Sequence, residues 1–220
     1  MVRSMKKHIL CFGDSNTYGF CADPKACADG GIRFNEEERW TCLLQKALGD
    51  HVLVTEEGLP GRTCVFDDPL TEGMNGLNSI YGLLKSHEMI DLLVIMLGTN
   101  DTKERFAANT YAIAKGMDRL CRKAISIDCW RDGKPNILIV SPPPIGKGVE
   151  HGIFAEEMGM GCAEKCEKMG AYYAQTAELL GLHFLDAAGC EFNTLDYMHL
   201  TREGHRQLAD LLAKKISSIL

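Results

Sequence analysis

Short apolar segments alternate along the chain with longer segments in which apolar residues recur at helical spacing. Runs of consecutive apolar residues predict buried strands, because neighbouring positions of a strand point to opposite faces of a sheet. The clearest run is LLVIML at residues 92–97, which is typical of a central parallel strand covered on both faces. The predicted strands cover residues 7–12, 52–55, 92–97, 136–140 and 183–185.

The segments between these strands show the spacing of apolar residues that is typical of helices. Apolar side chains recur three or four positions apart there, which is the spacing of one helix face. Residues 155–180 are expected to be mostly helical, with breaks at Gly159, Gly161 and Gly170. The other predicted helices cover residues 37–48, 77–85, 111–125 and 202–220.

Repeated alternation of strand and helix predicts an α/β protein, a three-layer α/β/α sandwich around a five-stranded parallel sheet. The length suits one domain, residues 1–220, since no internal repeat or Pro/Ser-rich linker divides the chain. Long loops are expected at residues 20–35 and 141–155, both after strands. Ligands of open parallel sheets bind beyond the carboxyl ends of the strands, so we expect the functional site there.

Charge and hydropathy narrow the classes of partner. The formal net charge is −6, which argues against a nucleic acid or an anionic membrane surface, since both select a basic face. The chain has no apolar run of about 18 residues, so no transmembrane helix is expected. The apolar stretch at residues 9–12 is too short for a secretion signal, and we expect a cytoplasmic protein.

The ten cysteines allow a disulfide framework, metal sites or a reduced chain with packing thiols. None forms a C-x-x-C pair. Cys162 and Cys166 are four positions apart on a predicted helix and could share a metal, but two thiols without a partner pair make a weak site. Reduced, mostly packing cysteines are therefore the favoured interpretation.

Polar motifs follow the predicted strands and should meet at the carboxyl edge of the sheet. The four motifs are Gly13-Asp14-Ser15-Asn16, Gly58-Leu59-Pro60-Gly61-Arg62-Thr63, Gly98-Thr99-Asn100-Asp101 and Asp196-Tyr197-Met198-His199. Together they supply a hydroxyl nucleophile, an imidazole base, an orienting carboxylate and donors for an oxyanion. These are the components of acyl transfer.

Each motif also has a purely structural interpretation. Gly13-Asp14-Ser15 is typical of a turn and a helix N-cap, and Asp196 or His199 can act as a cap as well. Asn100 can close a turn, and Gly61 can serve backbone geometry alone. The combination, in this order along the chain, favours the catalytic interpretation.

Other groupings could suggest a metal or a phosphate. His199 and His205 would be a metal pair only if they faced each other, and a helix from residue 202 would carry His205 away. Gly146-Lys147-Gly148 lacks the spacing and the Ser/Thr of a phosphate-binding loop. We therefore expect neither a metal nor a cofactor.

The four motifs resemble the four blocks of the SGNH (GDSL-type) hydrolases, and the resemblance covers essentially the whole chain. It is closest to the bacterial arylesterase and acyltransferase branch. The segments ILCFGDSNTYGF, EEGLPGRT, VIMLGTNDTK and VSPPP are similar to that branch in wording and spacing. The resemblance implies the flavodoxin-like SGNH hydrolase fold.

The resemblance also implies roles for individual residues. Ser15 would be the nucleophile, His199 the general base and then the acid, and Asp196 the group that orients the imidazole. The backbone N–H groups of Ser15 and Gly61 and the side-chain amide of Asn100 would form the oxyanion hole.

Five polar residues in or near the motifs are candidates for contacts with substrate or with another subunit. Asp14, Asn16, Thr99 and Arg62 are candidate substrate-binding residues. Arg62 and also Lys103 could contact substrate or a neighbouring subunit, or form solvated salt bridges instead.

These observations predict a serine esterase that hydrolyses small acetyl and aryl esters, with a small-molecule ester as its partner. Acyl transfer to alcohols is less secure than hydrolysis, because Gly61 departs from the second block of the acyltransferase. Carbohydrate O-acetylesterase or acyl-thioesterase activity is the alternative within this class, and a non-catalytic flavodoxin-like binding module is the alternative outside it. Because the resembled branch includes oligomers, we expect a homo-oligomer.

Overall fold

Five parallel strands form one sheet in the computed structural model, which describes residues 5–220. They lie in the order β2-β1-β3-β4-β5. Residues 1–4 of the predicted domain lie outside the described part. The strands are β1 (Lys7–Gly13), β2 (Val52–Gly58), β3 (Leu92–Met96), β4 (Ile137–Ser141) and β5 (His183–Asp186).

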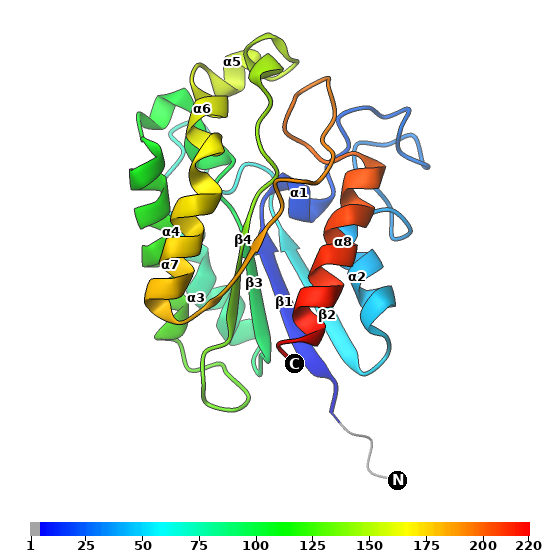
Figure 1. Ribbon diagram of the computed structural model, residues 1–220, viewed down its shortest axis with the longest axis vertical. Coiled ribbons are helices and arrows are strands. Elements are labelled where there is room, and N and C mark those ends of the chain that lie inside the picture. Colours follow the sequence, from blue (N-terminus) through cyan, green and yellow to red (C-terminus); the bar gives the residue numbers. More distant parts are fainter. Residues whose placement is uncertain (1–4) are drawn as a thin grey trace.

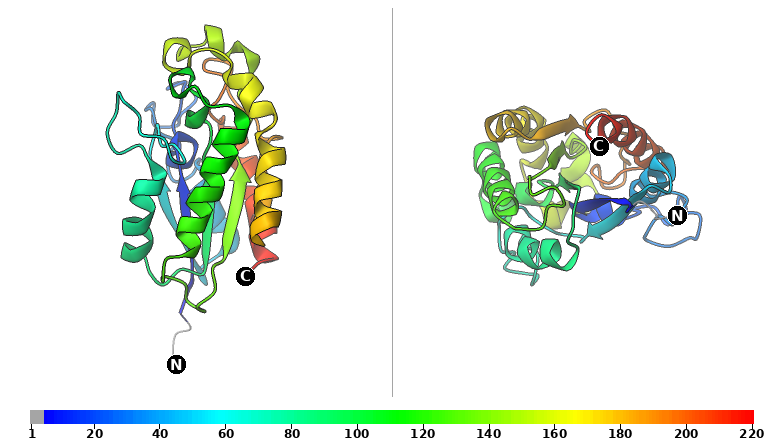
Figure 2. Two further views of the ribbon diagram at one scale, coloured as in Figure 1. Left: turned by 90° about the vertical axis from the view of Figure 1, so that its left-hand side faces the viewer. Right: turned by 90° about the horizontal axis from the view of Figure 1, so that it is seen from below.

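Long helices cover both faces of the sheet, as Figures 1 and 2 show. One face carries α3 (Gly76–Ser86), α4 (Thr110–Ile125) and α7 (Met169–Leu180). The opposite face carries α2 (Trp40–Leu48) and α8 (Arg202–Ser217). The predicted three-layer α/β/α class with a five-stranded parallel sheet is therefore confirmed.

Short helices gather at the end of the molecule to which the strands point (Figure 1). Each is a single turn or little more, within a loop that follows a strand. They are α1 (Ser15–Tyr18), α5 (Ala155–Met158), α6 (Cys162–Glu167) and the 3₁₀ turns η1 (Asn100–Thr102), η2 (Glu104–Phe106) and η3 (Lys147–His151).

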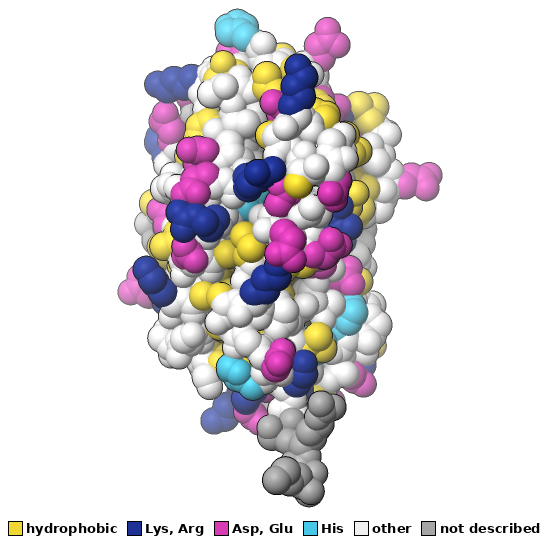
Figure 3. Space-filling model, turned by 90° about the vertical axis from the view of Figure 1, so that its right-hand side faces the viewer, with side chains coloured by type: hydrophobic (Ala, Val, Ile, Leu, Met, Phe, Trp, Pro, Cys, Tyr) yellow, Lys and Arg dark blue, Asp and Glu magenta, His cyan; other side chains and the backbone are white. Residues whose placement is uncertain are grey.

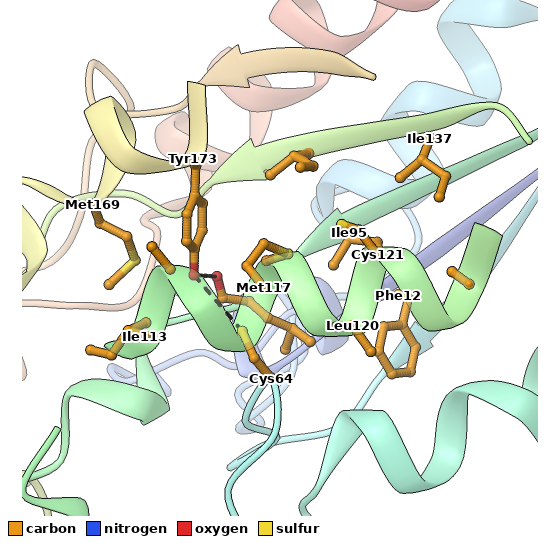
Figure 4. Close-up of a cluster of buried hydrophobic side chains, with 14 of the residues drawn as sticks. Phe12, Cys64, Ile95, Ile113, Met117, Leu120, Cys121, Ile137, Met169 and Tyr173 are labelled. Carbon is orange, nitrogen blue, oxygen red and sulfur yellow. Dashed lines mark hydrogen bonds between the residues drawn. The ribbon is translucent and has the colours of Figure 1, made fainter. Parts of the chain in front are cut away.

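Side chains of β3 alternate between two buried clusters. Leu93 and Ile95 belong to the cluster under α3, α4 and α7, part of which Figure 4 shows. Leu92, Val94 and Met96 belong to the cluster under α2 and α8. All five are at most 1% exposed, so the uninterrupted apolar run reflects burial on both faces of the strand.

The predicted helices are present, with boundaries that differ by one to three residues. The helix predicted at 37–48 begins only at Trp40, because the backbone N–H groups of Glu38 and Arg39 donate to the Asn35 carbonyl in a preceding turn. In the segment 155–180 the helix breaks between Met158 and Cys162, as the two glycines there predict.

Gly170 does not break the helix, contrary to the prediction. It lies inside α7, and the second break falls two residues earlier, at Lys168. A Cβ at position 170 would lie 3.5 Å from the carboxylate of Asp186, an ordinary contact, so the helix continues through this position without strain.

The face formed by α2 and α8 carries acidic and basic side chains side by side (Figure 3). Lys46 of α2 pairs with Glu37, and Arg206 of α8 pairs with Glu203 and Asp210. Among the helices of residues 5–220, none is long and apolar enough to span a bilayer.

Candidate active site

Ser15 is the first residue of α1, directly after the tight turn that ends β1. The Asp14 carboxylate caps this helix by accepting the backbone N–H of Asn16 at 3.0 Å. A Cβ on Gly13 would lie 2.0 Å from the hydroxyl of Thr17, so only glycine allows this turn. The local sequence therefore holds the Ser15 hydroxyl at the carboxyl end of a central strand.

The loop before α8 brings an imidazole to this hydroxyl. His199 Nε2 lies 2.7 Å from Ser15 Oγ, and His199 Nδ1 lies 2.7 Å from Asp196 Oδ2. All three residues are at least nine-tenths buried, with Asp196 fully so. In this arrangement an imidazole can remove the hydroxyl proton while a carboxylate holds its tautomer.

Asp196 is held as an anion by donors on its second oxygen. Oδ1 accepts the backbone N–H groups of Met198 and His199, both at 3.0 Å, and the side-chain amide of Asn193 at 2.8 Å. Burial raises the pKa of Asp196, but the hydrogen bonds from His199 and the backbone outweigh it and leave the pKa below its ordinary value. The carboxylate therefore stays charged beside the imidazole at neutral pH.

Asn193 has no counterpart in the sequence prediction. Its side-chain oxygen accepts the backbone N–H groups of Leu195 and Asp196, and its amide also donates to the His199 carbonyl at 2.8 Å. An asparagine three positions before the predicted Asp196 is the signal that could have found it, because asparagine often organises a turn in this way.

The loop that contains η3 is fastened to the Asp196–His199 loop. The Gly146 N–H donates to the Tyr197 carbonyl at 2.8 Å, and the Ile153 N–H donates to the Leu195 carbonyl at 3.1 Å. A Cβ on Gly148 would lie 2.3 Å from the Tyr197 ring, so the ring packs flat against this glycine. Tyr197 itself has a φ of 61°, which is uncommon for a residue with a side chain and occurs at functional sites.

Gly61 and Asn100 reach the same pocket from the other two motifs. Gly61 has a φ of 92°, a conformation that favours glycine. The Asn100 side-chain amide donates one hydrogen to the Arg62 carbonyl at 3.1 Å, which joins the second motif to the third and orients the amide. The backbone N–H groups of Ser15 and Gly61 have no acceptor within residues 5–220.

The third motif rests on the side chain of Tyr173, which Figure 4 shows. The Tyr173 hydroxyl, from α7, donates to the Leu97 carbonyl at 3.1 Å. Gly98 has a φ of 128°, and a Cβ there would lie 2.4 Å from the same hydroxyl. The glycine thus allows the chain to pass over the tyrosine just before Asn100.

These groups open onto a pocket of ≈ 230 Å³. Its walls combine the Ser15–His199 pair with aromatic and methionine side chains and one ion pair. The lining residues are Ser15, Phe20, Pro60, Gly61, Asn100, Lys103, Phe154, Glu157, Met158, Met198 and His199.

Asp14, Asn16, Thr99 and Arg62 do not line this pocket, although they were candidates for contacts with substrate. Their polar groups face the protein interior. Asn16 accepts the Leu200 N–H at 2.9 Å and donates to the Met198 carbonyl at 3.3 Å, which ties α1 to the histidine loop. Thr99 is 2% exposed.

Arg62 is buried rather than solvated. It donates to the Gly13 carbonyl at 2.9 Å, and its guanidinium lies 4.3 Å from the ring centre of Phe12. Burial lowers the pKa of Arg62 to about 10. Of the two basic candidates, only Lys103 lines the pocket.

The candidate metal pairs have other partners. His205 Nδ1 accepts the backbone N–H of Trp40 at 3.2 Å inside the core. Cys162 and Cys166 are buried, with their thiols near backbone carbonyls, Thr102 at 3.4 Å and Pro143 at 3.8 Å respectively. Within residues 5–220, no three side chains of metal-binding type cluster together.

A family model described as the GDSL-like lipase/acylhydrolase family matches residues 11–207. The chain belongs to this family. Together with the solved neighbours, the match makes the chain a carboxylic ester hydrolase. The alternative of a non-catalytic binding module is therefore set aside.

Solved structures of two esterases are similar to this chain over nearly its whole length. An aryl esterase from M. smegmatis is 34% identical, with a TM-score of 0.86 over 97% of this chain and 100% of that chain. A carbohydrate acetylesterase from Sinorhizobium meliloti is 32% identical, with a TM-score of 0.87 over 98% and 100%. A comparison with curated proteins gave no match.

A more distant structure shares the fold alone. A member of the lipolytic protein G-D-S-L family from Veillonella parvula is 15% identical, with a TM-score of 0.68 over 96% of this chain and 98% of that chain. The predicted flavodoxin-like SGNH hydrolase fold is confirmed by these neighbours.

Two buried carboxyl groups lie in the motifs of the site. Burial raises the pKa of Asp14 to about 6, although the hydrogen bond from Asn16 opposes the shift. One Asp14 oxygen has no donor among the described residues. Burial also raises the pKa of Asp101 to about 7. Each group therefore costs stability when it ionises near neutral pH.

We expect the Asp14→Asn variant to gain stability relative to the parent as the pH rises. The pKa of Asp14 in the folded chain, about 6, exceeds its ordinary 3.8, so the stability from the protonated carboxyl is complete below the ordinary value. It is lost as the pH rises through about 6. Asparagine keeps a capping oxygen and does not ionise.

Thermal melting of both proteins between about pH 4.5 and about pH 7.5 measures this effect. The melting temperature of the variant minus that of the parent should increase across the range. A difference that stays constant, or decreases, contradicts the raised pKa of Asp14.

Proposed function

We propose that this chain hydrolyses small acyl esters, acetyl and aryl esters first, through an acyl-serine intermediate. The observation that carries the proposal is the 2.7 Å contact between His199 Nε2 and Ser15 Oγ, with Asp196 at 2.7 Å from the other ring nitrogen. The similarity to an aryl esterase and to a carbohydrate acetylesterase supports the same chemistry.

In the proposed mechanism, Ser15 Oγ attacks the ester carbonyl carbon while its proton passes to His199 Nε2. Asp196 stabilises the resulting imidazolium. The oxyanion accepts hydrogen bonds from the N–H groups of Ser15 and Gly61 and from the side-chain amide of Asn100. His199 then donates its proton to the departing alcohol oxygen.

Water then hydrolyses the acyl-serine, taking the place that the alcohol had in the first half of the reaction. His199 takes a proton from the water molecule, the hydroxide attacks the acyl carbon, and Ser15 leaves with the proton returned by His199. One proton passes through His199 in each half of the reaction, first from Ser15 to the departing alcohol and then from water to Ser15.

The size and lining of the pocket support a short acyl group. A volume of ≈ 230 Å³ is small for an ester with a long chain. Phe20 and Phe154 flank the imidazole, with ring centres 4.5 Å and 6.1 Å from that of His199. Apolar rings at this point favour small acetyl or aryl groups and limit the entry of water.

We expect Ser15→Ala to lose at least about 10³-fold in kcat, because no other hydroxyl of residues 5–220 lines the pocket to form the acyl-enzyme. Hydrolysis of p-nitrophenyl acetate measures the loss, and a fluorophosphonate probe should label the parent but not the variant. Ser79→Ala is the matched control, since the Ser79 hydroxyl bonds within α3 to the Gly76 carbonyl. Equal rates for parent and Ser15→Ala would reject the mechanism.

The preferred substrate is tested separately by a panel of aryl acetates, acetylated sugars and acyl-CoA, with and without an alcohol acceptor. The apolar rings beside His199 lead us to expect the highest kcat/KM for aryl acetates. Because Gly61 departs from the second block of the acyltransferase, we expect hydrolysis in excess of transfer. A preference for acetylated sugars would assign O-deacetylation, and a preference for acyl-CoA would assign thioester hydrolysis. If the ester of the added alcohol is the main product, the activity is acyl transfer.

The proposal extends to the context in which the chain works. Residues 1–220 would act as one hydrolase domain, since one sheet supplies every motif of the site. All ten cysteines are free thiols, and most are buried, which supports a reducing compartment such as the cytoplasm.

A homo-oligomer is proposed because large apolar side chains are exposed in segments around the pocket. Leu70, Ile153 and Met160 are 73%, 60% and 59% exposed. Exposed apolar side chains in neighbouring segments are typical of contacts between subunits.

Light scattering should therefore give a mass that is a multiple of the 24.3 kDa of one chain. Dilution should lower the mass if the contact is weak, since association depends on concentration. A mass of one chain at every concentration would reject the homo-oligomer.

A further inference from the structure

One wall of the catalytic pocket holds a buried ammonium group. Lys103 lines the pocket together with Ser15 and Asn100, and it is only 5% exposed. It lies two residues after the third motif and caps the end of η1. A buried ammonium is costly unless an anion is close, so its partners decide which ligands the pocket accepts.

Lys103 belongs to a cluster of two cations and two anions. Its Nζ lies 2.7 Å from Glu157 Oε1 and 3.7 Å from Asp68 Oδ2. Arg105 contacts the same two carboxylates, with Nη2 at 2.5 Å from Glu157 and Nη1 at 3.7 Å from Asp68. The four formal charges cancel.

The two carboxylates of this cluster differ in their exposure to solvent. The Asp68 side chain is 2% exposed, whereas the Glu157 side chain is 47% exposed and belongs to the four-residue helix α5. Glu157 lines both the catalytic pocket and an adjacent hollow of ≈ 340 Å³. Its carboxylate can therefore move into water at low cost, which the Asp68 carboxylate cannot do.

Removal of the Glu157 carboxylate leaves the cluster with one uncompensated positive charge on the wall of the pocket. The backbone need not move with it, because Arg105 also donates to the Glu157 backbone carbonyl at 2.8 Å. The place that the Glu157 carboxylate leaves fits another group of the same shape and charge.

We propose that Lys103 binds a carboxylate of the substrate in the place that the Glu157 carboxylate occupies, so that the preferred substrates are small esters that carry a carboxylate. This inference rests on the proposed ester hydrolysis at Ser15. A carboxylate balances the single charge that Glu157 leaves, whereas a phosphate dianion would bring a second one. Since one pocket of ≈ 230 Å³ holds both Ser15 and Lys103, the ester and the carboxylate belong to one small molecule.

The alternative is that the ion pair merely closes a pocket for neutral esters. The two cases differ in the ratio of kcat/KM for an anionic ester to that for its neutral counterpart. One pair of substrates is 4-acetoxybenzoate and its methyl ester, with the charge on the alcohol part. The other pair is phenyl succinate and its methyl ester, with the charge on the acyl part. The pair that responds shows which part carries the carboxylate.

Lys103→Met should lower this ratio about tenfold in the responding pair, because a partly desolvated hydrogen bond to a charged group is lost. Glu157→Gln should raise the ratio, because the internal competitor is removed while its shape is kept. Lys46→Met and Glu37→Gln are matched controls, since they remove the same charges from an exposed ion pair between α2 and the turn before it. Both controls should keep the parent ratio.

The inference is overturned if the ratio changes by less than about twofold in both pocket variants, or equally in the surface controls. If Lys103→Met does not fold, the Glu157→Gln ratio decides: a rise supports the site and an unchanged or lower ratio rejects it.

Calorimetry of benzoate against benzamide provides a readout that does not depend on hydrolysis. The parent should bind benzoate in preference to benzamide, and Glu157→Gln should strengthen that preference. If the parent hydrolyses none of the esters, the proposed function fails, while preferential benzoate binding would still support Lys103 as an anion site. Equal binding of the two ligands rejects it.

Discussion

Parallel pairing of all five strands is the constraint on which the rest of the molecule depends. It places the carboxyl ends of β1, β2 and β3 at one edge and requires helices on both faces. Ser15, Gly61 and Asn100 follow these three neighbouring strands and so reach one pocket although they are far apart in sequence. The loop after β5 then has to cross to the same pocket with His199.

The site is held together by hydrogen bonds that join these loops to one another. The Asn16 side chain bonds the backbone of residues 198 and 200, and the Asn100 amide bonds the Arg62 carbonyl. Asp101 accepts the Cys64 N–H at 2.9 Å, which links the second and third motifs again. These bonds are buried, so each defines the distance between two loops of the pocket more strictly than a solvated contact would.

Charge is distributed unevenly around this pocket. Asp196 receives enough hydrogen bonds to remain ionised, whereas burial dominates at Asp14 and Asp101 and raises the pKa of both. The cluster of Lys103, Arg105, Asp68 and Glu157 is neutral as a whole, yet one of its anions is half exposed. Hydrogen bonds thus keep Asp196 charged beside His199, whereas the charges of Lys103 and Arg105 are balanced by ion pairs.

The sequence by itself determined the sheet, the order of its motifs and the residues that meet at its edge. Those features depend on the spacing of apolar residues and on local turns, as the LLVIML run and Gly13-Asp14-Ser15 illustrate. Only the tertiary structure decided which polar side chains line the pocket and which form hydrogen bonds to other loops. Asn16 and Arg62 turn inward to bond other loops, while Lys103 lines the pocket and Asn193 supports Asp196. The reason is physical: a side chain's partner depends on long-range contacts across the sheet edge, which local spacing does not encode.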